Sequence, residues 1–128
     1  MPKHKQRVMI IEDDADMIEL LSLVLKRGGY EPVAALGGCE GLRILQETPA
    51  DLILLDLMMD DISGWTLLQT IKKDSNLRDI PVLIVSAKHY LEDIDQTAAH
   101  AKLFEGYLVK PFVVEDLLSQ IVEALEPW

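Results

Sequence analysis

Apolar and polar residues follow two alternating patterns along the chain. Nearly unbroken apolar runs, such as residues 52–55, are typical of strands buried on both faces. Between these runs, apolar residues recur at helical spacing, as at Met17, Leu20 and Leu21. The apolar runs predict strands at residues 8–11, 31–35, 51–55, 81–85 and 104–109.

A helix is predicted after each of these strands. Asp14 is the expected N-cap of the first helix, and Gly28-Gly29 marks its end. The fourth helix has the weakest apolar stripe, which includes Leu91 and Ile94. The predicted helices cover residues 14–26, 38–47, 63–73 and 91–101, and the last runs from residue 114 to the end of the chain.

Strand–helix alternation with short links predicts an α/β fold. The expected architecture is a doubly wound, five-stranded parallel sheet covered by helices on both faces. A chain of 128 residues suits one domain, so we expect a single domain over residues 1–128, with a core of about residues 7–125. Ligands of such sheets bind beyond the carboxyl ends of the strands.

Charge and cysteine content narrow the classes of function. The 22 acidic residues outnumber the 12 basic ones, for a net charge of −10, which argues against direct binding of nucleic acid. No apolar run approaches the roughly 18 residues of a membrane helix, and the first residues lack the apolar stretch of a secretory signal. Cys39 is a single cysteine, which excludes an internal disulfide. We therefore expect a cytoplasmic protein without membrane insertion.

Chemically active residues follow four of the predicted strands. Glu12 and Asp13 follow the first strand, and Asp56 follows the third. Ser86 and Lys110 follow the fourth and fifth. Because these strand ends meet at one edge of the sheet, the residues are expected to converge there. Crowded carboxylates repel each other, and Mg²⁺, which prefers oxygen ligands, relieves that repulsion. The set predicts a magnesium site in which one carboxylate accepts a phosphoryl group.

Four sequence segments match a known family in order and separation. With them, the chain resembles the receiver domain of two-component response regulators over about residues 7–125, similar in extent to the single-domain chemotaxis regulators. The resemblance implies a flavodoxin-like fold with strand order 2-1-3-4-5. The matching segments are Val8-Met-Ile-Ile-Glu-Asp-Asp14, Leu52-Ile-Leu-Leu-Asp56 with Gly64 eight residues on, Val82-Leu-Ile-Val-Ser-Ala87, and Gly106-Tyr-Leu-Val-Lys-Pro-Phe112.

The resemblance implies a role for the acidic residues at the strand ends. Asp56 is the implied phosphoacceptor and also a ligand of Mg²⁺. Asp13 would bind the metal directly and Glu12 through a water molecule. The backbone carbonyl of Met58 would supply a further ligand.

The resemblance also implies roles for residues of the last two strands. Ser86 would bond a phosphoryl oxygen, and Lys110 would pair with the phosphoryl group. Tyr107 would be an aromatic switch that moves inward when Ser86 shifts toward the phosphate, or a ring packed beside the last helix. The bond from Lys110 to Pro111 is expected to be cis.

Three departures from the family pattern affect these expectations. Asp60 stands where the family often has proline, and both Asp60 and Asp61 are interpreted as turn or cap residues. Lys88, two residues after Ser86, is expected to overhang the phosphate and to tune how easily water reaches it. Residues 102–105 replace the usual Gly-Ala pair, so the register of the fourth helix is less constrained.

The implied function is that of a phosphoacceptor receiver in a phosphorelay. A histidine kinase or histidine phosphotransfer protein would supply the phosphoryl group to Asp56. The face formed by the fourth helix, fifth strand and fifth helix would then bind a downstream protein. The chain would be a substrate that catalyses only its own phosphorylation and dephosphorylation, and would be a monomer or a weak phosphorylation-dependent dimer. It is either a stand-alone regulator or the receiver of a longer protein.

Three alternatives belong to other classes of function. The first is a receiver-like binding module that is never phosphorylated. The complete set of acids, hydroxyl and lysine argues against it, because such a module would not need them. A flavodoxin-type flavin carrier needs a phosphate-binding loop after the first strand, where Glu12 and Asp13 would repel phosphate. A phosphatase with an aspartate nucleophile needs a second acid two residues beyond it, where Met58 stands.

Overall fold

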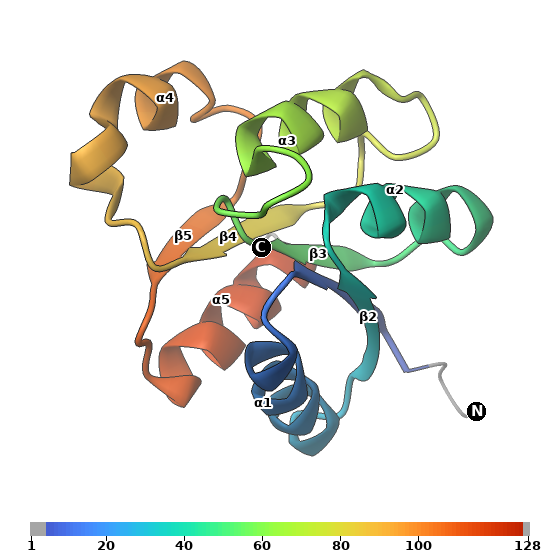
Figure 1. Ribbon diagram of the computed structural model, residues 1–128. Helices are drawn as coiled ribbons and strands as arrows, with labels where there is room; N and C mark the ends of the chain where they lie inside the picture. Colours follow the sequence, from blue (N-terminus) through green and yellow to red (C-terminus); the bar gives the residue numbers. More distant parts are fainter. Residues whose placement is uncertain (1–4, 127–128) are drawn as a thin grey trace.

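The computed structural model describes residues 5–126, which form a parallel sheet with helices on both sides (Figure 1). Its strands are β1 (Arg7–Glu12), β2 (Glu31–Leu36), β3 (Leu52–Leu55), β4 (Val82–Ser86) and β5 (Gly106–Val109). Their order is β2-β1-β3-β4-β5, and all neighbouring strands are parallel. The predicted doubly wound, flavodoxin-like fold with strand order 2-1-3-4-5 is therefore confirmed.

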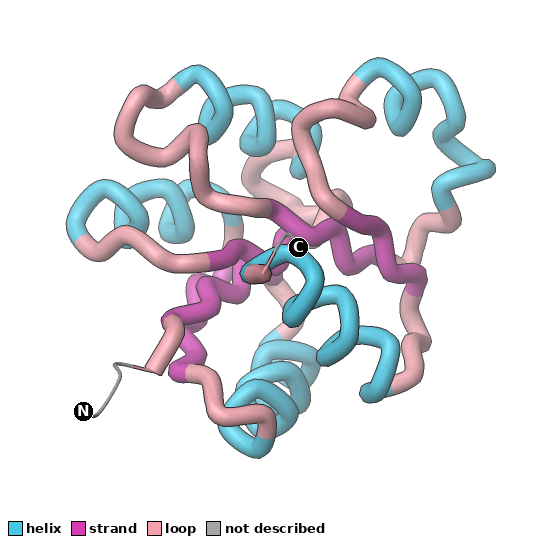
Figure 2. Tube along the Cα trace, turned by 180° about the vertical axis from the view of Figure 1, so that it is seen from behind, coloured by secondary structure: helices cyan, strands magenta, loops and turns pink. Residues whose placement is uncertain are grey.

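A helix follows each strand. Figure 1 shows the first and last helices on one side of the sheet and the other helices on the opposite side, and the rear view in Figure 2 shows the same division. The helices are α1 (Ala15–Arg27), α2 (Gly38–Glu47), α3 (Gly64–Lys73), α4 (Ile94–Ala99) and α5 (Val114–Leu125).

Two apolar cores lie on the two faces of the sheet. Successive residues of a strand point to opposite faces, so β1 contributes to both cores. Val8 and Ile10 pack with α1 and α5, whereas Met9 and Ile11 pack with α2 and α3. All four side chains are fully buried. This two-sided burial explains why the strands are continuous apolar runs rather than alternating ones.

Local signals set the start and end of α1 as predicted. The side chain of Asp14 accepts hydrogen bonds from the backbone N–H groups of Asp16 and Met17. Gly28 caps the other end, and Gly29 has a φ of 90°, a conformation that favours glycine. This capping places Glu12 and Asp13 directly between the end of β1 and the start of α1.

The fourth helix differs from its prediction. Instead of one helix over residues 91–101, the chain forms a 3₁₀ turn at Tyr90–Asp93 followed by the six residues of α4. Leu91 and Ile94 are 63% and 59% exposed, so the apolar stripe does not face the core. The 3₁₀ turn has about three residues per turn, so a spacing that assumes 3.6 no longer places these side chains on one face.

Two further element boundaries differ from their predictions by more than one residue. β5 begins at Gly106 rather than at residue 104, although Phe104 still packs against the core from the preceding loop. Because Phe104 is apolar, the sequence pattern places it in the strand, although it packs against the core from outside the strand. α5 ends at Leu125, and the part of its prediction that concerns residues 127 and 128 lies outside the described residues. Across residues 5–126, every helix falls short of the length and apolarity that crossing a bilayer requires.

Candidate functional site

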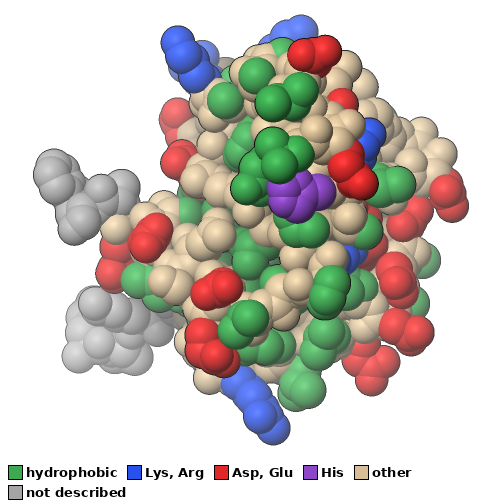
Figure 3. All heavy atoms as spheres, turned by 90° about the vertical axis from the view of Figure 1, so that its left-hand side faces the viewer, with side chains coloured by type: hydrophobic (Ala, Val, Ile, Leu, Met, Phe, Trp, Pro, Cys, Tyr) green, Lys and Arg blue, Asp and Glu red, His purple; other side chains and the backbone are tan. Residues whose placement is uncertain are grey.

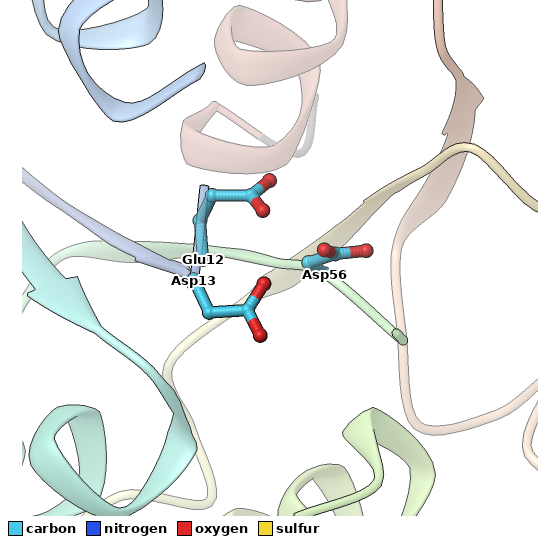
Figure 4. A group of neighbouring side chains, drawn as sticks. All are labelled: Glu12, Asp13 and Asp56. Carbon is cyan, nitrogen blue, oxygen red and sulfur yellow. The ribbon is translucent and has the colours of Figure 1, made fainter. Parts of the chain in front are cut away.

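Three carboxylates meet at the carboxyl ends of β1 and β3 (Figure 4). Glu12 ends β1, Asp13 follows it, and Asp56 follows β3. One carboxylate oxygen of each residue lies within 4.8 Å of the others, and Figure 4 shows the three side chains pointing to the same side. Parallel pairing places Ile11 opposite Leu55, and it therefore brings both strands to the same edge of the sheet.

Glu12 is buried, with only 3% of its surface exposed. Its Oε1 accepts a hydrogen bond from Lys110 Nζ, and its Oε2 accepts one from the backbone N–H of Asp14 at 3.2 Å. Burial raises the pKa of Glu12 to about 7; Lys110 opposes this rise and the neighbouring charge of Asp56 adds to it. Burial of the carboxylate therefore outweighs the favourable bond from Lys110.

Asp56 is also buried, and its two oxygens have different surroundings. The carboxylate Oδ1 accepts a hydrogen bond from the backbone N–H of Met58 at 3.2 Å. The other oxygen, Oδ2, lies 3.8 Å from Lys110 Nζ. Met58 itself is 58% exposed and Asp13 is only partly buried, so the cluster borders the surface on this side.

Gly64 lets α3 begin directly against the backbone that follows β3. A Cβ atom added to Gly64 would lie 2.5 Å from both the carbonyl oxygen of Asp56 and the Cα of Leu57. The Gly64 N–H donates to the carbonyl of Leu57 at 3.1 Å, which closes the contact. Only glycine permits this approach, and the loop that carries Asp56 and Met58 is therefore held by α3.

The loop that follows β3 also holds the side chain of Asp13. Its Oδ2 accepts a hydrogen bond from the backbone N–H of Asp60 at 3.0 Å. A proline, which the family often has at position 60, could not donate this bond because it has no N–H. The departure at Asp60 therefore gives Asp13 a backbone partner.

Asp61 is a cap residue, as expected. Its carboxylate accepts hydrogen bonds from the backbone N–H groups of Gly38 and Cys39 at the start of α2. These bonds, that from Cys39 first, lower the pKa of Asp61. Asp61 thus joins the loop after β3 to a helix far from it in sequence, and it does not contribute to the acidic cluster.

Lys110 and Ser86 complete the site from β4 and β5. The backbone N–H of Lys110 donates to the carbonyl of Ser86 at 2.8 Å, and its side chain reaches across to Glu12 and Asp56. The side chain of Ser86 is fully buried. The peptide bond between Lys110 and Pro111 is cis, as expected.

Tyr107 lies half-buried beside the loop that follows β4. Its hydroxyl donates a hydrogen bond to the backbone carbonyl of Lys88. Burial raises the pKa of Tyr107, with the Ser86 side chain acting in the opposite direction. The ring packs edge-on against Tyr90 and Phe104, so Tyr107 is both a packed aromatic and a neighbour of Ser86. The inward movement of Tyr107 remains a prediction.

The acidic cluster suits a hard divalent cation. Three carboxylates within 4.8 Å of one another supply the oxygen ligands that Mg²⁺ prefers, and a cation there would offset the charge of three carboxylates that share one lysine ammonium. The donor set contains no soft ligand such as a thiolate, because Cys39 lies exposed on α2. The residues therefore fit magnesium.

The sequence did not indicate two side chains near the site, Trp65 and Asp93. Trp65 follows Gly64 on α3, and its Nε1 donates to Asp93 Oδ2 at 3.0 Å. Lys88 Nζ lies 3.5 Å from the same oxygen of Asp93. Lys88 is thus paired with Asp93, in addition to standing two residues beyond Ser86. No sequence spacing indicates a contact between residues 65 and 93, because it depends on how α3 packs beside the 3₁₀ turn.

Comparison with known proteins identifies the family. The family model described as the response regulator receiver domain matches residues 8–122. The master transcriptional regulator RpaA of Synechocystis sp. is 35% identical over 115 residues, which cover 90% of this chain and 47% of the relative. The phosphate regulon regulator PhoB of Escherichia coli is 33% identical over 91% of this chain and 50% of the relative. The chain spans about half the length of these relatives.

Solved structures show the same fold. A sensor protein from Polaromonas sp. JS666 superposes with a TM-score of 0.90 at 25% identity, covering 97% of this chain and 98% of that one. The chemotaxis protein CheY4 of Vibrio cholerae superposes with a TM-score of 0.86 at 26% identity, covering 95% of this chain and 100% of that one. Because the family model matches nearly the whole chain, the chain belongs to the response regulator receiver domain family, the phosphoacceptor domains of two-component signalling.

Proposed function

We propose that Asp56 accepts a phosphoryl group from a phosphohistidine of a histidine kinase or histidine phosphotransfer protein. The observation that carries this proposal is a buried carboxylate that shares one cluster with Glu12 and Asp13 and has the Lys110 ammonium 3.8 Å from its Oδ2. A carboxylate is a competent nucleophile for phosphorus when nearby cations offset the charge of the incoming group.

The transfer is a displacement at phosphorus. An oxygen of Asp56 forms the new bond to phosphorus, the phosphorus–nitrogen bond of the donor breaks, and its electron pair stays on the imidazole. Lys110 stabilises the negative charge of the transferred oxygens, and the Ser86 hydroxyl donates a hydrogen bond to one of them. The chain is consumed as a substrate and acts on no outside molecule.

Glu12, Asp13, Asp56 and the backbone carbonyl of Met58 would hold Mg²⁺ in this site. Magnesium, when bound, supplies positive charge that stabilises the phosphoryl oxygens during transfer. Glu12 and Asp13 are positioned for this by the Asp14 N–H and the Asp60 N–H respectively. The exposed side of the cluster beside Met58 leaves the donor a way in.

Phosphorylation changes charge at the point where β4 and β5 meet the site. The phosphoryl group adds about −1.5 to −2 charge, which draws Ser86 and Lys110 toward it. Tyr107 lies beside Ser86 and is bonded to the loop before α4, so its rearrangement reaches the face formed by α4, β5 and α5. This face, seen in Figure 3 with apolar and acidic side chains side by side, would bind the downstream protein.

The same proposal includes the location, oligomeric state and partners of the chain. We place the chain in the cytoplasm as a single receiver domain, a monomer or weak phosphorylation-dependent dimer that binds proteins rather than nucleic acid. The net charge of −10 supports protein partners over nucleic acid.

The test is mass spectrometry after incubation with a small phosphodonor and Mg²⁺. The wild-type chain is expected to gain the mass of one phosphoryl group, and Asp56→Asn is expected to gain none. Asp79→Asn removes the same charge from an exposed loop and should behave as the wild type. A wild-type chain that stays unmodified would favour the alternative of a binding module that is not phosphorylated.

A further inference from the structure

Asp93 connects α3 to the loop that follows β4. Its Oδ2 accepts a hydrogen bond from Trp65 Nε1 at 3.0 Å and lies 3.5 Å from Lys88 Nζ. The Trp65 ring stacks on His100 with the ring centroids 4.7 Å apart, and Trp65 is only 8% exposed. The carboxylate of Asp93 is therefore anchored to a packed part of the molecule.

The backbone of Lys88 is held by hydrogen bonds, whereas its side chain is partly exposed and its ammonium is paired only with Asp93 among the described residues. Its N–H donates to Ser86 Oγ at 3.2 Å, and its carbonyl accepts from the Tyr107 hydroxyl. These bonds hold the start of the side chain next to the hydroxyl that would bind a phosphoryl oxygen. The side chain is 38% exposed, and its ammonium ends a flexible four-carbon stem.

We propose that Asp93 is a positioning residue, which holds the Lys88 ammonium at the rim of the site until Asp56 is phosphorylated. This inference rests on the proposed function of Asp56. A phosphoryl group carries about −1.5 to −2 charge against the single charge of a carboxylate, so it competes with Asp93 for the ammonium. Lys88 then moves from Asp93 to the phosphoryl oxygens, while Asp93 stays bonded to Trp65.

The consequence concerns hydrolysis of the aspartyl phosphate. In that step a water oxygen bonds to phosphorus, the bond from phosphorus to the Asp56 oxygen breaks, and the electron pair returns to the carboxylate. Inorganic phosphate leaves, and the surplus proton of the water passes to solvent. Attack requires the face of phosphorus opposite Asp56. An ammonium resting on the phosphoryl oxygens covers that approach and slows hydrolysis.

Asp93 therefore shortens the lifetime of the phosphorylated state by competing for Lys88. The size of the effect is bounded by the strength of the pair. A partly exposed ion pair of this kind changes an equilibrium by about two- to fivefold. The same bound applies to the lifetime, because Asp93 acts only through the fraction of Lys88 that it retains.

The experiment compares the decay of the phosphorylated chain in four variants by mass spectrometry. Asp93→Asn removes the charge but keeps an oxygen that accepts the Trp65 bond, and it is expected to lengthen the lifetime about two- to fivefold. Lys88→Met removes the ammonium and should shorten the lifetime. In the Lys88→Met background, Asp93→Asn should add nothing. Asp95→Asn, an exposed acid on α4, should leave the lifetime unchanged.

The outcomes separate the two proposals. If the wild type takes up no phosphoryl group, the proposed function fails and this inference fails with it. If uptake is normal but Asp93→Asn decays at the wild-type rate, only the inference is overturned. An effect of Asp93→Asn that persists in the Lys88→Met background also overturns it, since Asp93 would then act through the fold. Denaturation midpoints of all variants identify any loss of folding.

Discussion

Helices α3 and α4 follow adjacent strands, yet they are held very differently. Five of the ten residues of α3 are buried: Gly64, Trp65, Leu67, Leu68 and Ile71. Every residue of α4 is at least partly exposed. α3 follows the loop that carries Asp56, whereas α4 follows the segment that carries Lys88, directly after Ser86 at the end of β4. The proposed acceptor Asp56 therefore lies beside a well-packed helix, and the segment proposed to respond to its phosphorylation is weakly packed.

This contrast has a functional meaning. Segments that change conformation come from the parts of a fold with few buried apolar contacts, because they open at a low free-energy cost. The contact of Gly64 with the backbone of Asp56 keeps the loop after β3 in place. Side-chain and loop hydrogen bonds near α4, such as that between Tyr107 and the Lys88 carbonyl, can be exchanged without disturbing the core.

The largest effect expected from this comparison is on stability. Leu68→Ala in α3 removes a fully buried side chain and should lower the unfolding free energy by about 2–5 kcal/mol. Ile94→Ala in α4 removes a side chain that is 59% exposed and should change it by less than about 0.5 kcal/mol. Urea denaturation measures both. Similar losses in the two variants would contradict the division into a packed and a weakly packed element.

A smaller effect is expected where α3 ends. Lys72 Nζ donates to the backbone carbonyls of Arg78 and Ile80, and burial lowers the pKa of this ammonium. Lys72→Met should lower the unfolding free energy by about 1.5–3 kcal/mol, because both carbonyls lose a charged donor. Lys73→Met, on the exposed neighbour, is the matched control and should be close to neutral. Equal midpoints in a denaturant titration would show that Lys72 does not anchor this end.

The smallest effect is expected at Asp61, which joins the loop after β3 to α2. Hydrogen bonds from the Cys39 and Gly38 N–H groups hold its folded pKa below the unfolded value. The stabilisation is therefore complete above the unfolded pKa and is lost as the pH falls through the folded pKa. Asp61→Asn should cost about 0.5–1 kcal/mol at neutral pH, since this exposed site makes weaker bonds than a buried one.

The pH series supplies the control for Asp61. The difference between Asp61→Asn and the wild type should shrink in acid, where the wild-type carboxyl is also neutral. Glu19→Gln, which is exposed on α1, should show no such dependence. A difference at Asp61 that is the same at neutral and acid pH would mean that its charge does not hold the start of α2.

Much of the fold was predictable because its signals are local. The apolar run at residues 52–55 indicates a strand buried on both faces, and the N-cap at Asp14 lies within three residues of the N–H groups that it binds. Convergence of Glu12, Asp13 and Asp56 also followed from the sequence, since parallel strands bring their carboxyl ends together. Alternation of strands and helices was sufficient for that inference.

Local sequence patterns did not predict the structure correctly where packing between distant segments determines it. The stripe through Leu91 and Ile94 has helical spacing, but the chain turns there in a tighter 3₁₀ helix and the stripe faces solvent. The sequence by itself determined which elements form and which residues reach the functional edge of the sheet, because periodicity and the alternation of strands and helices are properties of the chain. Tertiary structure alone decided that Asp93 bonds to Trp65 and Lys88, because that contact joins segments whose distance depends on how α3 packs against its neighbours.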